Sequence, residues 1–261
     1  MRALFVALLC LPILAQAQTN QDSVTIKKMV DEVMTNGKAY DLLRELTKKI
    51  GGRLAGSPQQ QNAAIWGKRN LASFNPDKVF LQACKTPNWQ RGGKDFAAIV
   101  GIGGVATNQP LAALALGNSL SSNGLVEADI IAVANFDELE KRKDEIKGKI
   151  VYYHSVFNPT KVQTFQAYGE MGVYRSTGAS RAAKYGAVGV MIHSLSTAPD
   201  NEPRTGGMKY DESYPKIPAV ALGPNDAKAL YELTKKNTVR GQIQTYGFFL
   251  PDADENNVVA E

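Results

Sequence analysis

The sequence contains two histidines, His154 and His193, and each ends a short apolar run that predicts a β-strand. If both strands belong to one parallel sheet, their carboxyl ends share an edge and the two imidazoles become neighbours. Such a pair could hold a metal or act as an acid/base group, or the residues could simply be polar side chains that end strands. The sequence contains no HExxH or CxxC spacing that would indicate a zinc site. Both interpretations stay open.

Three other patterns lack the context that catalysis needs. The stretch Gly178-Ala179-Ser180-Arg181-Ala182 resembles a GxSxG serine elbow, but it lacks the final glycine and falls within a predicted helix. Gly101–Gly104 follows a predicted strand but opens no helix, so a turn is favoured over a phosphate-binding loop. Asp252 and Asp254 are expected to be solvated. We therefore predict no catalytic, cofactor-binding or metal-binding residue in this chain.

The loop 201–214 is the strongest candidate for a contact surface. Arg204 offers a planar donor fork that suits carboxylates, and the glycines that follow Thr205 expose backbone N–H groups. Arg204, Thr205 and Tyr210 are our candidate substrate contacts. A flexible surface loop is the alternative.

Residues 1–17 have the pattern of a secretory signal peptide. Arg2 supplies the positive charge, 3–14 the apolar run, and Ala15-Gln16-Ala17 the small-x-small cleavage site. The apolar run is shorter than the roughly 20 residues that span a membrane. We expect cleavage after Ala17 and a secreted or periplasmic product.

Residues 18–76 are predicted to form a helical N-terminal segment. Ser57 is a good N-cap, Pro58 suits the first helical position, and Gln60 completes the spacing of a capping box. The three predicted helices cover 22–36, 38–50 and 57–72. The residues expected to face inward from the third helix are Ala64, Ile65 and Leu71.

After this segment the apolar residues recur in short runs typical of strands. We predict a strand-rich connector over 77–119. Over 120–248, strands alternate with helices, as in an α/β domain. The predicted strands are 78–83, 96–101, 111–116, 128–134, 149–154, 188–193, 217–222 and 239–245. The predicted helices are 137–146, 176–185 and 224–236, and 157–172 is predicted to be a loop.

Residues 249–261 are expected to be a linker and the start of a further domain. Residues 251–257 are predicted to be exposed and acidic, and 258–260 to begin an apolar strand that has no partner in this chain.

Composition excludes some classes of partner. The formal net charge is +5, but the lysines are scattered among acidic residues without aromatic interleaving, so nucleic-acid binding is not expected. Cys84 is the only cysteine after the leader, so no internal disulfide is expected.

Five short motifs, taken in order, resemble the M28 family of zinc exopeptidases. They are Ile50-Gly-Gly-Arg-Leu-Ala-Gly-Ser-Pro58, Trp89-Gln-Arg-Gly92, Phe136-Asp-Glu-Leu139, Gly148-Lys-Ile-Val151 and Pro215-Lys-Ile-Pro218. In that family a helical segment and a protease-associated (PA) domain precede or interrupt a zinc-binding α/β catalytic domain. The resemblance implies that 120–248 is a PA domain and that 257–261 begins the catalytic domain. The expected fold is therefore α/β, truncated at the first catalytic strand.

Two functional hypotheses follow from this resemblance. The first is the leading part of an exported M28-type carboxypeptidase- or dipeptidase-like enzyme that is inactive alone. Its zinc ligands and peptide substrate would belong to the missing catalytic domain. The second is a stand-alone exported PA-domain module that binds peptides or proteins. A homo-oligomer is left open, and no membrane contact is expected once the leader is removed.

Overall fold

The computed structural model describes residues 21–261, so the predicted signal peptide lies outside the described residues. The chain divides into two compact units, one made of Met1–Cys84 with Glu255–Glu261 and the other of Lys85–Asp254. The boundaries predicted from the sequence stay predictions. Within the described part of the chain, no helix is both long and apolar enough to cross a membrane.

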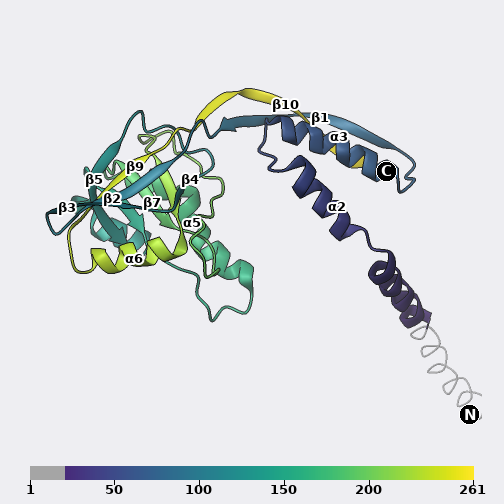
Figure 1. Cartoon of the computed structure of the whole chain (residues 1–261), viewed down its shortest axis with the longest axis horizontal. Helices are drawn as coiled ribbons and strands as arrows, with labels where there is room; N and C mark the ends of the chain where they lie inside the picture. The colour runs from purple at the N-terminus through teal and green to yellow at the C-terminus, as the bar shows by residue number, and fades with distance from the viewer. Residues whose placement is uncertain (1–20) are drawn as a thin grey trace, which may run out of the picture. The chain divides into compact units, whose positions relative to one another are not determined.

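The first unit consists of helices and a short stretch of paired strands (Figure 1). Residues 21–36 are helical, and α2 (Ala39–Glu45) continues into a π-helical turn at Leu46–Ile50. Helix α3 (Pro58–Ala72) begins as predicted, with the Ser57 hydroxyl accepting a hydrogen bond of 3.2 Å from the Gln60 N–H.

The face of α3 that packs inward is narrower than predicted. Ala64 is buried, but Ile65 is 60% exposed, which corrects the prediction for that residue. The covered face of α3 is the one that approaches the last strand, since a Cβ at Gly67 would lie 3.4 Å from the Val258 side chain. Ile65 is two residues before Gly67 and therefore lies on a different side of α3 from that contact.

Strands β1 (Val79–Gln90) and β10 (Phe248–Ala260) pair in a two-stranded sheet. Lys78 and Glu261 exchange both backbone hydrogen bonds (3.0 and 2.9 Å), as antiparallel neighbours do. The linker predicted at 251–257 is therefore wrong, since these residues belong to β10; the strand predicted at 258–260 is present, but it has a partner in β1. Main-chain pairing decides the conformation here, and Pro251 is tolerated because a strand of a two-stranded sheet is always an edge strand.

The second unit is built around an eight-stranded mixed sheet with the order β3-β2-β9-β5-β6-β7-β8-β4. Strands β5 to β8 are mutually parallel, and the outer pairs are antiparallel. The strands are β2 (Phe96–Ile102), β3 (Val105–Pro110), β4 (Ala113–Ala115), β5 (Val126–Val133), β6 (Ile150–Tyr153), β7 (Gly189–His193), β8 (Ala219–Leu222) and β9 (Val239–Gln244). The helical elements are α4 (Phe136–Lys141), a 3-10 turn at Lys143–Glu145, α5 (Thr164–Ala183) and α6 (Pro224–Thr234).

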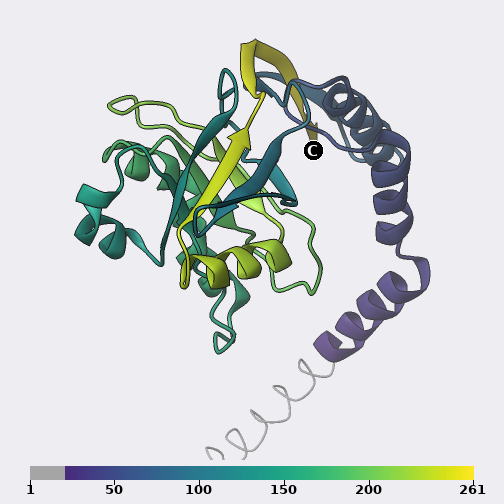
Figure 2. The ribbon, with the colours of Figure 1, turned by 60° about the vertical axis from the view of Figure 1, so that its left-hand side comes forward.

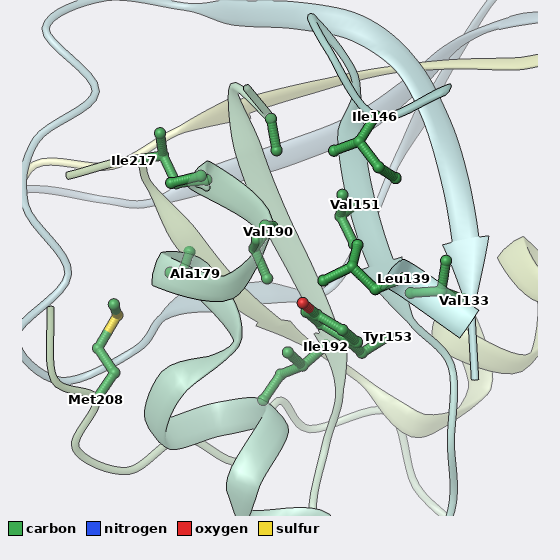
Figure 3. Packing of buried hydrophobic residues seen from close by; sticks show 14 of the residues in the cluster. Val133, Leu139, Ile146, Val151, Tyr153, Ala179, Val190, Ile192, Met208 and Ile217 are labelled. Carbon is green, nitrogen blue, oxygen red and sulfur yellow. The ribbon is translucent and has the colours of Figure 1, made fainter. Parts of the chain in front are cut away.

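Alternate residues of the parallel strands pack on opposite faces of this sheet. Tyr153 belongs to an apolar cluster with residues of α4 and α5, such as Leu139 and Ala179 (Figure 3). Its neighbour Tyr152 belongs to a second cluster with Leu230 of α6. Figures 1 and 2 both show α6 running along the sheet. Because side chains alternate between the two faces of the sheet, helices pack on both faces and form a three-layer α/β unit. This confirms the predicted α/β class.

Two elements differ from the prediction. Helix α5 begins at Thr164, so the loop predicted at 157–172 is wrong in its second part. The first half of this helix contains two glycines, which are poor helix formers, and therefore did not indicate a helix. The polar strand β3 was not predicted, since it lies at an exposed sheet edge. The turn predicted at Gly101–Gly104 is confirmed: Gly103 and Gly104, both with positive φ, connect β2 to β3.

Candidate functional site

The two histidines meet at the carboxyl edge of the parallel strands, as their positions predicted. His154 follows β6 and His193 ends β7, and both line a cavity of about 290 Å³. Helix α6 contributes four residues to the lining, namely Pro224, Asn225, Lys228 and Tyr231. Ligands in α/β proteins bind preferentially at this edge of a sheet. The cavity is therefore a candidate binding site.

His193 presents one ring nitrogen to a hydrogen-bond partner and leaves the other free. The side chain is only 8% exposed, and its Nδ1 atom lies 2.7 Å from the Ser194 carbonyl oxygen. Because a carbonyl can only accept, this contact assigns the ring proton to Nδ1. Burial lowers the pKa of His193, so the ring is neutral at pH 7 and Nε2 is a hydrogen-bond acceptor.

His154 forms part of an aromatic wall. Its ring stacks on Tyr231 with centroids 3.8 Å apart and planes 15° apart. Burial is the main cause that lowers the pKa of His154, while the nearby carboxylate of Glu138 opposes it. The Tyr152 hydroxyl donates to the Ala227 carbonyl at 2.7 Å and so ties α6 to β6 beside this stack.

These residues do not fit a zinc centre. A protein zinc site takes three or four His, Cys, Asp or Glu ligands, and no three such side chains come together among residues 21–261. The ring of His154 is also covered on one face by Tyr231.

The structure places Arg204 in an ion pair within its own loop. Its guanidinium contacts Asp200 through two bonds of 2.7 Å, and its backbone N–H donates to the Ser194 hydroxyl at 2.8 Å. The hydrogen bond from Arg204, helped by the Glu202 N–H, lowers the pKa of Asp200 to about 2. Thr205 beside it is half-buried. The loop is hydrogen-bonded to its surroundings, and the predicted role of Arg204 and Thr205 in substrate contact stays a prediction.

Tyr210 lies at a different cavity. Its hydroxyl donates to the Ile217 carbonyl at 2.7 Å and accepts from the Leu120 N–H at 3.2 Å. It lines a space of about 600 Å³ that Arg204 and Thr205 do not line. The structure therefore does not gather the three predicted contact residues at one cavity. The other residues around this larger cavity are Thr177, Ser180, Arg181, Lys184, Lys209, Asp211, Glu212 and Tyr214.

The contribution of α6 to the histidine cavity was missed from the sequence. Lys228 and Tyr231 line this cavity together with Asn225 near the start of the helix. Pro224 at the first helical position marked where the helix begins. No sequence signal indicated on which face of the sheet α6 would pack.

The Trp89-Gln-Arg-Gly92 motif serves the fold. The Trp89 indole donates to the Ser119 carbonyl at 3.0 Å, and the Ser119 hydroxyl accepts from the Ala219 N–H at 3.0 Å. Arg91 pairs with the buried Asp95 at 2.7 Å. The side chains of this motif therefore stabilise the fold.

Known proteins resemble the chain in both sequence and fold. No family model matches it. Carboxypeptidase Q of Xenopus laevis is 32% identical over 243 residues, which cover 90% of this chain and 49% of the relative. A crystal structure of a peptidase M28 precursor from Shewanella amazonensis SB2B superposes with a TM-score of 0.84 and 28% identity, covering 92% of this chain and 54% of that one. A zinc aminopeptidase from Bacillus subtilis shares the fold, with a TM-score of 0.51 and 14% identity over 85% of this chain and 46% of its own.

The fold and these likenesses place the chain with the M28 peptidases, which confirms the resemblance inferred from the five motifs. Within that class it is a carboxypeptidase Q-like protein. The chain spans about half the length of the curated relatives it matches.

Proposed function

We propose that this chain forms the N-terminal portion, including a PA domain over 120–248, of an exported M28-type zinc peptidase. The complete enzyme would hydrolyse peptides as a carboxypeptidase or dipeptidase. The likeness to the Shewanella amazonensis peptidase, which extends over 92% of this chain, carries the proposal. The signal-peptide pattern of residues 1–17 supports export.

Peptide hydrolysis would require the part of the relatives that has no counterpart in this chain. The described residues do not form a zinc site. In the complete enzyme, the zinc ligands are expected to come from that other part. We therefore expect residues 18–261 alone to be inactive on peptides. Their role would be to position or cover the catalytic centre.

A chimera provides the test. Residues 18–261 are joined to the portion of the Shewanella amazonensis peptidase that follows the matched region, and dipeptide hydrolysis is measured with zinc and with a chelator. Residues 18–261 alone and the Shewanella portion alone are the matched controls. We expect chelator-sensitive hydrolysis by the chimera only. Hydrolysis by residues 18–261 alone would contradict the proposal, as would a folded chimera without activity.

Arg204 is a candidate for binding the substrate carboxylate in the complete enzyme. Since its donor fork already holds Asp200, a substrate would have to displace that side chain. Arg204→Ala should then raise KM, and Asp200→Asn, which frees the fork, should lower it. Unchanged KM values in both variants would exclude the role.

One observation favours the alternative of a stand-alone binding module. The unit Lys85–Asp254 has its own apolar clusters on both faces of its sheet, together with the two cavities described above. Peptide binding by this chain, combined with a folded but inactive chimera, would support the module.

A further inference from the structure

We propose that the histidine cavity binds a small ligand that carries a carboxylate, an apolar body and an N–H donor. A free amino acid and the C-terminal residue of a peptide share this chemistry. The site does not depend on the proposed peptidase function, because this chain supplies all of its lining. Its position at the carboxyl edge of β6 and β7, beside the start of α6, is where an α/β sheet commonly receives ligands.

A carboxylate has donors available on α6. Lys228 lines the cavity, and no salt bridge within 4.0 Å is found for it among residues 21–261, although its charge acts on Glu232 one turn further along α6. One turn earlier, the Asn225 N–H has no hydrogen-bond partner in the described chain, whereas the next N–H, of Asp226, donates to the Asn201 side chain at 3.0 Å. Lys228 and Asn225 both line the cavity, so an ammonium group and the N-terminal end of a helix, each of which favours an anion, belong to its lining.

An N–H donor of the ligand has a candidate acceptor in His193, which also lines the cavity. His193 is more than nine-tenths buried, and its Nδ1 is engaged with the Ser194 carbonyl. Its Nε2 has no partner among the described residues, so the neutral ring offers one acceptor in the cavity wall. An imidazole nitrogen of this kind can accept a hydrogen bond from a ligand that enters the cavity.

The remaining surface suits an apolar body. The stacked rings of His154 and Tyr231 both line the cavity, and so do Phe157 and Val156. The volume of about 290 Å³ lies near the lower end of the range of roughly 300–1,000 Å³ for ligand pockets. A ligand the size of one residue therefore matches the space better than an extended peptide.

The larger cavity at Tyr210 matches this ligand less well. Two acidic residues, Asp211 and Glu212, line it together with the basic side chains, so its charge is mixed. It also contains no histidine. Lys209 nevertheless lines that cavity without an ion pair among residues 21–261, which makes it a matched control for Lys228.

Calorimetric titration of the whole chain tests the proposal. The ligands are N-acetyl-L-phenylalanine, its C-terminal amide, and free L-phenylalanine. N-acetyl-L-phenylalanine represents a peptide C-terminus, so the tighter of the two acids identifies the source of the ligand. We expect Lys228→Gln to weaken binding of N-acetyl-L-phenylalanine about tenfold or more, and Lys209→Gln to leave this affinity unchanged. The amide should bind weakly to both variants.

Two further readouts locate the contacts. If Lys228 holds the carboxylate, replacing the acid by the amide should cost little affinity in Lys228→Gln, so that the two changes are not additive. The ¹⁵N resonance of His193 Nε2 should shift when the acid binds. Absence of binding by both acids would overturn the proposal. So would weakening by Lys209→Gln rather than Lys228→Gln, or an unchanged His193 resonance.

Discussion

The two units of this chain differ in how their apolar side chains are used. In Lys85–Asp254, strands and helices bury two apolar clusters, one on each face of the sheet. In the other unit, Ala64 is the only buried apolar residue among those described. Its helices instead expose apolar side chains, including Val24, Ile26, Met29, Val30, Val33, Met34, Tyr40, Leu43 and Ile65. Local signals can thus define helices in both units, while only one unit contains a core that stabilises them.

Truncating a matched pair of apolar residues should show the largest difference. Leu230 of α6 is fully buried, so Leu230→Ala should lower the free energy of unfolding by about 2–5 kcal/mol through lost burial and an unfilled cavity. Ile65→Ala, at a residue that is 60% exposed, should change it by less than about 0.5 kcal/mol. Urea unfolding of the chain measures both. Similar losses would show that Ile65 is covered in solution.

The start of α3 should contribute a moderate amount. Ser57→Ala removes the hydroxyl that caps the Gln60 N–H and should cost about 1 kcal/mol. The loss should be confined to amide exchange in α3, since the other unit has its own core. Ser57→Asp is the control, because aspartate caps equally well. Faster amide exchange throughout β6 and β7 would instead show that the two units unfold as one cooperative structure.

The buried histidines should make the unit Lys85–Asp254 sensitive to mild acid. Burial lowers the folded-state pKa of both His154 and His193, so below the unfolded value of about 6.5 the unfolded chain binds more protons. The stability is fully present above that value and falls as the pH decreases through 6.5 toward the lowered folded pKa. Melting temperatures between about pH 7 and pH 5 measure the effect. His193→Asn should flatten the dependence, and an unchanged slope would contradict the assignment.

The smallest effect is expected at the Asp200–Arg204 pair, which is on the surface. Its folded pKa of about 2 lies below the usual 3.8, so the contact persists above that usual value and is lost as the pH falls toward 2. Carboxyl resonances of Asp200 should report this titration, and Arg204→Gln should return the pKa toward 3.8. Because exposed ion pairs contribute little, global stability should barely change.

The parts that local chemistry fixes were predictable from the sequence. The Ser57 cap, the buried strands β6 to β8 and the meeting of His154 with His193 follow from spacing and strand ends. Contacts made across the fold were not predictable. The pairing of β10 with β1 depends on backbone groups, and the packing of α6 beside the histidines depends on which face of the sheet its crossover takes. The Arg204–Asp200 bond also arises from loop geometry that the residue types do not specify.

The antiparallel ladder of β1 and β10 has a consequence for engineering. Lys85 and Asp254, which bound the larger unit, are joined by an ion pair of 2.7 Å across the two strands. The polypeptide thus enters and leaves that unit side by side, about one strand spacing apart. A module with adjoining ends can be transplanted into a surface hairpin of a host protein without stretching either partner.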